Sequence, residues 1–504
     1  MIEPREYQSR CIEIVYNNFF KKNDQLVSLP TASGKTIIFT LLLKKCLEVF
    51  PELKACVLVN QVKLVTQTQD KLKLAIDETK TGLYCGTLGE YNEDNEITVA
   101  SIDTIWRSPR HFNVIIVDEC HNADHSARYQ KFLADCLEIN PKLKIVRFTA
   151  TPFTSKGFIF GEDKPNKSID FQIRMDEMIN MKFIVAPKFT APEVAFDVSG
   201  LKKRGGDYLQ KELEDLTDDE EKIADQVEDA MKRLSGRKKV VWCCTSIRHA
   251  EIVQNEVRKY EDCAIIHSKL SKREQQFELA SFEKFGVRHI SSVTMVSEGF
   301  DFPEIDAIVA MRPTRSPVLY VQLVGRGLRL FPGKEDCLFL DYGHIVENLG
   351  TPWNPAVNAK NDKKTEAELK CLICPSCRTI NFLPRKTCSD CGFEFFDEEK
   401  PKKEHAKNLS RFAADWNFGV KEKITFELPI LGAEYDPDYV SKKGHDCLKC
   451  TFTTMKGPIY KYFKRGSKFH LDFLRDRKLM GDPTLLIVER NGKWLNAKEI
   501  KWKK

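Results

Sequence analysis

The chain has 504 residues, of which 42% are hydrophobic and 30% are charged. This composition excludes a wholly disordered chain, and the length allows about three domains. No stretch approaches the roughly 20 apolar residues of a membrane span, and the N-terminal sequence lacks the basic-then-apolar pattern of a signal peptide. We therefore expect a cytoplasmic protein that does not enter a membrane.

The net charge of +6 is unevenly distributed along the chain. Residues 442–504 contain 17 Lys and Arg against 6 Asp and Glu, a net charge of +11, so residues 1–441 carry a net charge of −5. A basic C-terminal segment on a mildly acidic body indicates a polyanionic partner such as nucleic acid. A solvated basic terminus would give the same count.

Residues 1–155 alternate short β-branched runs with helical stretches, which predicts a first domain with a parallel sheet covered by helices on both faces. Its expected strands are 25–29, 55–59, 97–101, 114–117 and 144–149. Residues 156–235 are less regular. There we expect a hinge segment that contains an acidic, solvated helix around residues 211–222.

The alternation resumes in residues 236–348 and predicts a second α/β domain. Its expected strands are 238–245, 263–267, 289–293, 307–311 and 337–340. After a polar linker, residues 371–396 hold a group of cysteines. Residues 423–504 consist of short apolar runs and turns, which predicts a small basic β-rich module. The expected fold class is therefore α/β, with two parallel-sheet domains followed by two small domains.

A phosphate-binding loop is predicted after the first strand, where LPTASGKT at residues 29–36 precedes a helical stretch. Lys35 would pair with the β- and γ-phosphates, Thr36 would help to hold Mg²⁺, and backbone N–H groups would face the phosphates. The signature expects Gly at the position of Leu29, so the match is incomplete. The loop residues expected around the nucleotide are Thr31, Ala32, Ser33, Gly34, Lys35 and Thr36.

Two carboxylates follow the apolar run at residues 114–117, in the sequence VIIVDECH. A buried parallel strand would deliver them to its C-terminal edge, beside the phosphate-binding loop. Asp118 can hold Mg²⁺ through water, and Glu119 can polarise the attacking water. A strand that ends in acidic surface residues is the alternative, which the pairing with Lys35 disfavours.

These two motifs together resemble those of superfamily 2 helicases and translocases, whose further motifs follow in order as far as residue 329. The resemblance implies two RecA-like domains that bind ATP. It implies that residues 57–67 and 98–105 contact the nucleic-acid backbone, and that TATP at 149–152 links hydrolysis to domain movement. The other residues that it places at the nucleotide are Arg5 and Gln8 at the adenine, Gly299 and Asp301 in SEGFD, and Gln322.

The sixth motif, QLVGRGLR at residues 322–329, carries two arginines in the second predicted domain. An Arg brought across a cleft can neutralise charge on the transferred phosphoryl group. By resemblance, Arg326 and Arg329 supply that contact, and His121 lies near the same interface. Surface arginines on a helix are the alternative, although the spacing after the other motifs disfavours it.

Four cysteines are spaced as two CxxC pairs: Cys374, Cys377, Cys388 and Cys391. This spacing is typical of a four-thiolate Zn²⁺ site in a zinc ribbon, and a closed site of this kind is structural. Cys371 forms a further CxxC with Cys374, so the ligands of the first pair are ambiguous. The alternative is that these are unrelated reduced thiols, as we expect for most of the 17 cysteines.

Residues 456–465 (KGPIYKYFKR) interleave aromatic and cationic side chains. They could stack on bases and follow phosphates, or form an alternating strand with Ile459 and either Tyr462 or Phe463 in a core. We expect the module to contact nucleic acid, whichever residues make the contact.

The DECH and TATP sequences and the trailing cysteine group resemble RadD-like helicases and phage branch-migration helicases of the T5 and UvsW types. The resemblance implies a monomeric, ATP-dependent motor on branched or duplex DNA, which remodels forks and Holliday junctions in replication, recombination or repair. Protein partners are not indicated. An RNA helicase, the motor subunit of a restriction system and a nucleic-acid-binding scaffold without ATPase activity are the alternatives.

Overall fold

A computed structural model describes residues 3–154, 157–293, 302–357, 371–382, 385–395, 425–440, 446–454, 457–465, 473–475, 478, 482–491 and 494–501. The chain divides into two compact units, residues 1–399 and residues 400–504. Within the described ranges, no helix has both the length and the apolar character that a bilayer crossing requires.

The first sheet lies in the N-terminal part of the first unit and has the strand order β10-β1-β7-β6-β2-β5-β3-β4. All neighbouring strands are parallel except β3 and β4. The strands are β1 (Asp24–Ser28), β2 (Ala55–Val59), β3 (Thr81–Cys85), β4 (Glu90–Tyr91), β5 (Ile97–Ser101), β6 (Val114–Val117), β7 (Lys144–Thr149) and β10 (Phe171–Gln172). The parallel sheet expected from the sequence is confirmed, with β3, β4 and β10 in addition.

Helices cover both faces of this sheet because successive strand residues point to opposite sides. Val27 packs with Phe39 on the face of α1 (Glu6–Asn18), α2 (Lys35–Val49) and α3 (Val62–Lys73). Leu26, its neighbour in β1, packs with Phe132 on the face of α4 (Ile102–Ile105) and α5 (Ala127–Ile139). The strands are therefore buried on both faces, which explains their continuous apolar runs.

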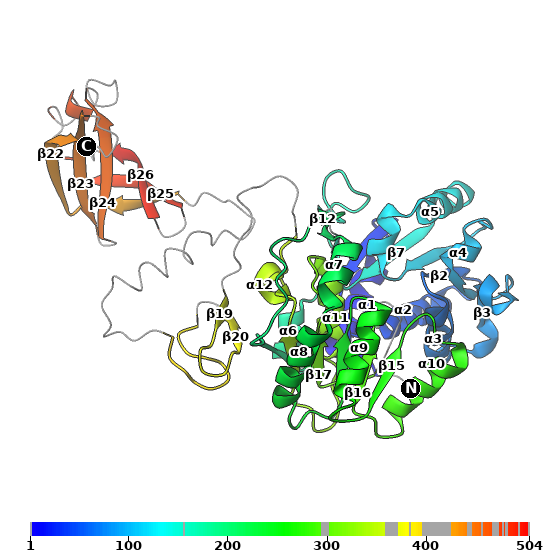
Figure 1. The fold of residues 1–504 in the computed structure, drawn as a ribbon. Helices are drawn as coiled ribbons and strands as arrows, with labels where there is room; N and C mark the ends of the chain where they lie inside the picture. Colours follow the sequence, from blue (N-terminus) through cyan, green and yellow to red (C-terminus); the bar gives the residue numbers. More distant parts are fainter. Residues whose placement is uncertain are drawn as a thin grey trace. The chain divides into compact units, whose positions relative to one another are not determined.

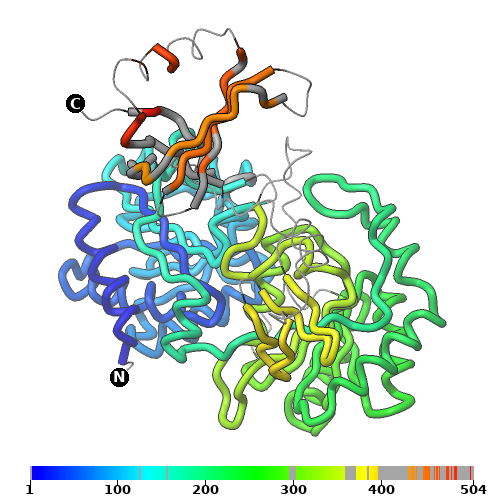
Figure 2. The backbone as a smooth tube through the Cα atoms, turned by 90° about the vertical axis from the view of Figure 1, so that its left-hand side faces the viewer, coloured from blue at the N-terminus to red at the C-terminus, as the bar shows by residue number. Residues whose placement is uncertain are grey.

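The second sheet has six parallel strands in the order β11-β18-β17-β14-β16-β15. They are β11 (Ala186–Thr190), β14 (Val240–Cys243), β15 (Cys263–Ile266), β16 (His289–Ser292), β17 (Ala307–Ala310) and β18 (Asp336–Asp341). Helices α8 (Glu220–Arg233) and α9 (Ile247–Val257) cover one face, and α10 (Lys272–Glu283) and α11 (Pro317–Arg326) the other. Figure 2 shows the two α/β domains side by side, the first in blue to cyan and the second in green to yellow. The two RecA-like domains implied by the resemblance are confirmed.

Residues 157–235 contribute elements to both sheets. Strand β10 pairs with β1, and β11 pairs with β18 on the other side of α6 (Met175–Asn180). The acidic segment forms α7 (Gln210–Thr217) and the start of α8. Helix α8 buries Ile223, Val227 and Ala230 in the core of the second sheet, because these residues share one helix face.

Two short strands close the first unit. β19 (Cys371–Ile373) and β20 (Ile380–Phe382) form an antiparallel pair beside β11. Phe382 lies with its ring centroid 5.8 Å from that of Phe189 in β11. Thr379, just before β20, forms an antiparallel bridge with Thr190. This small domain thus packs on the edge strand of the second sheet.

The second unit contains two three-stranded antiparallel sheets, β21-β25-β26 and β22-β23-β24. Their strands are β21 (Thr425–Pro429), β22 (Gly432–Val440), β23 (Asp446–Thr454), β24 (Gly457–Lys464), β25 (Leu485–Asn491) and β26 (Trp494–Lys501). The β-rich module expected from the sequence is therefore present. In β24, Ile459 and Phe463 are buried and Tyr462 is exposed, so the alternation places Phe463 in the core.

Candidate active site

The loop between β1 and α2 is shaped by its glycine and by the start of the helix. Gly34 has a φ of 75°, and a Cβ there would lie 2.7 Å from the Gln8 Nε2 atom. Only glycine satisfies both conditions without strain. Leu29, where the phosphate-loop signature expects glycine, is buried, and its N–H donates to the Thr149 carbonyl 2.9 Å away. That position therefore extends the strand.

Lys35 and Glu119 meet at the C-terminal edge of the first sheet, as the motif positions suggest. The Lys35 Nζ atom donates to the Glu119 Oε1 atom at 2.6 Å. Burial acts to raise the pKa of Glu119, but the charge and hydrogen bond of Lys35, with a smaller contribution from the charge of Arg326, hold that pKa below its usual value. Glu119 is therefore a carboxylate, the form that can accept a proton from water.

Asp118 precedes Glu119 at the end of β6, and its N–H donates to the Leu58 carbonyl at 3.0 Å. Burial and the adjacent Glu119 charge raise the pKa of Asp118 to about 6. Asp118 and Thr36 line the same cavity, and their side chains carry a carboxylate and a hydroxyl. Both are oxygen ligands, which suit Mg²⁺, so these residues fit the ion.

His121 connects the DECH and TATP motifs. Its Nδ1 atom lies 3.0 Å from Thr149 Oγ1 and 3.2 Å from Thr151 Oγ1, within hydrogen-bonding distance of both. It also lies 3.4 Å from the Glu119 Oε2 atom. Burial lowers the pKa of His121, which favours a neutral ring. A movement of the Glu119 carboxylate would therefore change the position of His121 and its hydrogen bonds to Thr149 and Thr151.

The N-terminal motif contacts the phosphate-binding loop. The Gln8 Nε2 atom donates to the Ser33 carbonyl at 2.9 Å, and Gln8 Oε1 accepts from the Arg5 N–H at 2.9 Å. Tyr7, which the motif analysis missed, donates its hydroxyl to the same carbonyl at 2.6 Å. Both ends of the Gln8 amide are thus engaged within the protein, whereas Arg5 lines the cavity.

Helix α11 of the second sheet carries the sixth motif to the phosphate-binding loop. A Cβ at Gly325 would lie 2.7 Å from the Thr31 Cβ atom, so the two domains approach closely at this glycine. Arg326 and Arg329 line the cavity that also contains Lys35 and Glu119. This approach joins residues almost 300 positions apart in the sequence.

One cavity of about 710 Å³ collects most of the predicted nucleotide site. Gln8 is not in its lining, and Gly299 and Asp301 lie outside the described residues. The lining also includes Phe183 and Lys71, which the motif analysis missed because neither belongs to a recognised sequence pattern. The predicted residues that do line it are Arg5, Thr31, Ala32, Ser33, Gly34, Lys35, Thr36, Asp118, Glu119, Gln322, Arg326 and Arg329.

The four cysteines of the two CxxC pairs form a cluster in the small domain, with all sulfur atoms within 4.8 Å of one another. The Cys374 and Cys391 sulfurs lie 3.6 Å apart, and those of Cys377 and Cys388 lie 3.5 Å apart. Zn–S bonds of 2.3 Å in a tetrahedron require about 3.8 Å between sulfurs. The cluster therefore fits Zn²⁺. Among the described residues, Cys371 is not part of it.

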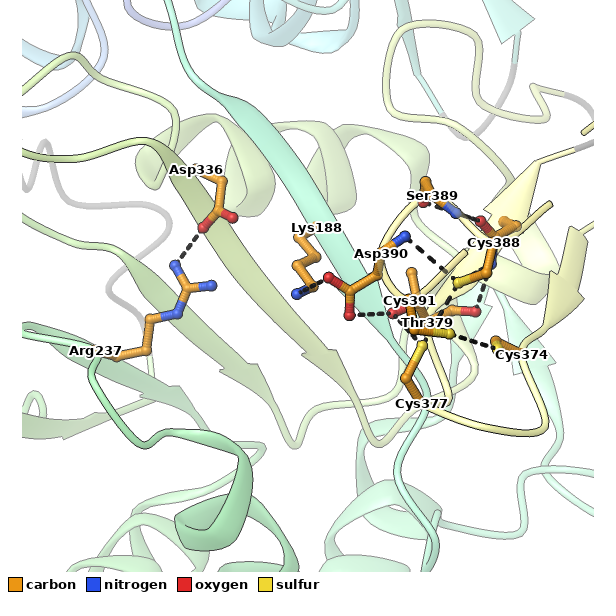
Figure 3. A network of polar contacts seen from close by, with 11 residues as sticks. Lys188, Arg237, Asp336, Cys374, Cys377, Thr379, Cys388, Ser389, Asp390 and Cys391 are labelled. Carbon is orange, nitrogen blue, oxygen red and sulfur yellow. Dashed lines mark hydrogen bonds and ion pairs between the residues drawn. The ribbon is translucent and has the colours of Figure 1, made fainter. Parts of the chain in front are cut away.

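A polar network joins this cluster to the second sheet (Figure 3). The Asp390 carboxylate pairs with Lys188 of β11 and accepts a hydrogen bond from the Thr379 hydroxyl at 3.2 Å. The Cys377 sulfur lies 3.3 Å from the same hydroxyl. The Arg378 guanidinium donates to the Ala191 carbonyl at 3.1 Å. The cysteine cluster is thus connected to the edge of the second sheet through a few short contacts.

Two family models match the chain. The model described as "Type III restriction enzyme, res subunit" matches residues 1–154, and the "Helicase conserved C-terminal domain" model matches residues 222–330. The first match contains the phosphate-binding loop and the DECH sequence, and the second ends just after the sixth motif.

Similar proteins are also found among curated sequences and solved structures. Irc3 of Saccharomyces cerevisiae, whose name describes an ATP-dependent helicase, is 26% identical over 67% of this chain and 51% of its own length. The chain thus spans about half of that relative. The "51.5 kDa protein" of a Lactococcus phage is 24% identical over 94% of this chain and 100% of its own length.

A fragment of an HsdR subunit of a type I restriction enzyme from Vibrio vulnificus has a similar fold. Its TM-score is 0.54 at 19% identity, over 69% of this chain and 66% of that chain. The similarity covers the fold of the two α/β domains. The restriction-subunit model matches the first RecA-like domain, the helicase model matches most of the second, and a curated relative is named as a helicase. The chain therefore belongs to the superfamily 2 helicases.

Proposed function

We propose that the chain is an ATP-driven translocase that remodels branched DNA, such as forks and four-way junctions. The observation that carries the proposal is a cavity that is lined by Lys35 and Glu119 of the first domain and by Arg326 of the second. A nucleotide in this cavity would touch both domains at once. Hydrolysis of this nucleotide would therefore change the contacts between the two domains.

Each group in the cavity has a chemical task in this proposal. Lys35 releases Glu119 and pairs with the β- and γ-phosphates, while Glu119 orients and deprotonates the attacking water. Arg326 and Arg329 neutralise charge that develops on the transferred phosphoryl group. Mg²⁺ would neutralise phosphate charge, and Thr36 and Asp118 would hold it.

The coupling to movement follows from two contacts. His121 transmits a change at Glu119 to Thr149 and Thr151, which begin the connection to the second domain. Gly325 against Thr31 makes the closed arrangement depend on the shape of the phosphate-binding loop. Cycles of closure and opening would move the backbone-binding segments, residues 57–67 and 98–105, relative to the second domain.

These two segments are well placed to act together. Residues 57–67 include the end of β2 and the start of α3, and residues 98–105 include β5 and α4. Strands β2 and β5 are neighbours in the sheet and run parallel. The loops after them therefore share one edge of the domain, where they can follow one strand of nucleic acid.

We further propose that Cys374, Cys377, Cys388 and Cys391 hold a structural Zn²⁺ ion. The sulfur spacing and the absence of a fifth protein ligand among the described residues support a closed four-thiolate site. The basic C-terminal module would add contacts to DNA phosphates, because residues 442–504 carry a net charge of +11 while the rest of the chain carries −5.

DNA is preferred over RNA because the DECH and TATP sequences, together with the cysteine cluster, resemble DNA translocases. A second candidate, the motor subunit of a restriction system, is favoured by the restriction-enzyme family model at residues 1–154. The two candidates differ in their substrates, because a restriction motor works on linear duplex DNA together with a nuclease.

The test is ATP turnover and strand separation on matched substrates: a fork, a four-way junction, a linear DNA duplex and an RNA duplex. Branched DNA should stimulate both activities most, and Lys35→Ala should abolish turnover on every substrate. Equal stimulation by linear duplex without junction processing would favour the restriction motor. Stimulation by RNA alone would refute the DNA assignment.

A further inference from the structure

Phe183 lies in the wall of the nucleotide cavity beside Arg5, outside every sequence motif. The Arg5 guanidinium carbon stands 4.8 Å from the centroid of the Phe183 ring, and the Tyr7 ring centroid lies 5.1 Å from it. The ring is half-buried and is a partly buried neighbour of the main core. Phe183 thus has one side on the core and contacts the guanidinium on the cavity side.

A helix C-cap holds Phe183 in this position. The Phe183 N–H donates to the Met178 carbonyl at 2.9 Å, and the Lys182 N–H donates to the Ile179 carbonyl at 2.9 Å. Lys182 has a φ of 58°, in the left-handed region. These two bonds and the left-handed residue form a Schellman motif, which ends α6 and fixes the direction of the chain that follows.

The same short loop contacts the arginine segment of the second domain. Two residues after Phe183, the Val185 N–H donates to the Leu328 carbonyl at 2.9 Å. Leu328 lies between Arg326 and Arg329 in the sequence. On its other side, Phe183 contacts Tyr7, whose hydroxyl bonds the Ser33 carbonyl of the phosphate-binding loop. Residues 183–185 therefore contact both the N-terminal motif and the arginine segment.

The residues that recognise the base of the nucleotide are less clear than those that contact its phosphates. The resemblance assigns base recognition partly to Gln8, but Gln8 is buried, bonds Ser33 and Arg5 within the protein, and does not line the cavity. A planar guanidinium can stack on a base and can donate hydrogen bonds at its edge. Such a group recognises a base well only if its plane is held in one orientation.

We propose that Phe183 is a positioning residue for the base: it holds the Arg5 guanidinium flat against the cavity and connects base binding to the loop that carries Arg326 and Arg329. This inference rests on the proposed ATPase function. It predicts a preference for purine over pyrimidine triphosphates, because a purine offers more area to the held guanidinium. It also predicts that the preference depends on the flat ring at position 183.

A purely structural role for Phe183 makes a different prediction. An apolar side chain that only fills the space between the domains could be replaced by leucine with little change in nucleotide preference. If packing alone were lost, the KM for every nucleotide would change by the same factor. The ratio of the KM values for ATP and CTP therefore separates positioning of Arg5 from packing.

The experiment measures DNA-stimulated turnover of ATP and CTP by the full chain and by Phe183→Leu, Phe183→Tyr and Phe20→Ala. Phe20 is an aromatic residue of the first domain that is 82% exposed and lies outside the cavity, so its variant is the control. Phe183→Leu should raise the KM for ATP by about tenfold, raise that for CTP less, and change kcat less than twofold. Phe183→Tyr, which keeps a flat ring at this position, should have the wild-type ratio of the KM values for ATP and CTP.

An unchanged ATP to CTP ratio in Phe183→Leu, or an equal rise in both KM values, would overturn the proposal. A changed ratio of the two KM values in Phe183→Tyr would also overturn it. A wild-type chain that hydrolyses neither nucleotide would instead refute the proposed ATPase. The two failures are thus distinguishable in one set of assays.

Discussion

Lys35 and Glu119 form an ion pair across the nucleotide cavity, with the Nζ atom 2.6 Å from the Oε1 atom. Lys35 is the first residue of α2 and Glu119 follows the end of β6, so the two residues are 84 positions apart in the sequence. In the absence of a nucleotide, each charge therefore compensates the other inside a partly buried site. A triphosphate would compete with Glu119 for the lysine, and the released carboxylate would be available to act on water.

Glu119→Gln separates nucleotide binding from hydrolysis. The glutamine keeps the size of the side chain but cannot take a proton, so turnover should fall by at least about 100-fold. Because Lys35 remains, ATP should still bind, with an affinity equal to or higher than that of the wild type. Fluorescent-nucleotide titration and steady-state turnover measure the two effects. Loss of binding together with turnover would contradict the assigned role of Glu119.

Arg326→Ala should reduce kcat by about 1000-fold, the effect of removing an arginine that acts on the phosphoryl group. Arg326→Lys should have a kcat only slightly higher than that of Arg326→Ala, because a lysine lacks the planar fork of donors. The KM for ATP should change much less than kcat. Single-turnover kinetics with saturating ATP would check this. A variant with wild-type kcat would show that this arginine does not reach the reacting phosphate.

Gly325→Ala tests the close approach of α11 to the phosphate-binding loop. Its added methyl group would meet the Thr31 side chain at 2.7 Å, too close for two carbon atoms. We expect kcat to fall by at least about tenfold while isolated ATP binding survives, because the arginines can no longer reach the phosphates. Thr31→Gly in the same chain should restore part of the loss. Normal turnover in the single variant would mean that the domains do not need this contact.

The cysteine cluster should contain one Zn²⁺ per chain, measurable by elemental analysis. Cys377→Ser should reduce the metal content and increase hydrogen exchange in residues 371–382. Lys188→Ala should retain the metal but increase exchange in β11 and β20, since it removes only the contact to Asp390. Lys131→Ala, which breaks an exposed pair with Asp135, serves as the control. Full zinc content in the Cys377 variant would refute the ligand assignment.

His249 makes the stability of the second domain sensitive to acid. Burial lowers the pKa of this histidine to about 3, below the value of about 6.5 in an unfolded chain. The unfolded state therefore binds the proton first, and stability is lost as the pH falls from 6.5 towards 3, by up to about 1.4 kcal/mol per pH unit. Chemical denaturation of the wild type and of His249→Gln, each at pH 7 and at pH 5, would measure how much free energy of unfolding each protein loses. The wild type should lose more free energy of unfolding than the variant, and equal losses would contradict this cause.

Much of the fold could be predicted because its strands are buried on both faces. Residues 55–59, 97–101, 114–117 and 144–149 have the predicted bounds in the structure, since each is a short, mostly apolar segment rich in β-branched residues and bounded by polar ends. Strand β3 was missed because TGLYC contains a glycine and no extended apolar run. Strand β11 was missed because it joins a sheet whose other strands begin about 50 residues later, and its pairing with β18 leaves no local pattern.

The site was predictable where a motif encodes a local shape, as in the loop at residues 29–36. It was less predictable where the site depends on contacts between side chains that are far apart in the sequence. Phe183 is placed by a helix cap, and its contact with Arg5 joins segments far apart in sequence. The engagement of both ends of the Gln8 amide also could not be inferred, because it depends on the distance to the Ser33 carbonyl.

The central claim is that one nucleotide is shared by both domains, and DNA-stimulated ATP turnover tests it most directly. Wild type, Lys35→Ala and Arg326→Ala should be compared on the same four-way junction, with ATP binding measured in parallel. We expect strong stimulation in the wild type, no turnover in Lys35→Ala, and in Arg326→Ala turnover reduced by about 1000-fold with ATP binding retained. Stimulated turnover at the wild-type rate in Arg326→Ala would show that the second domain takes no part in hydrolysis and would contradict the account.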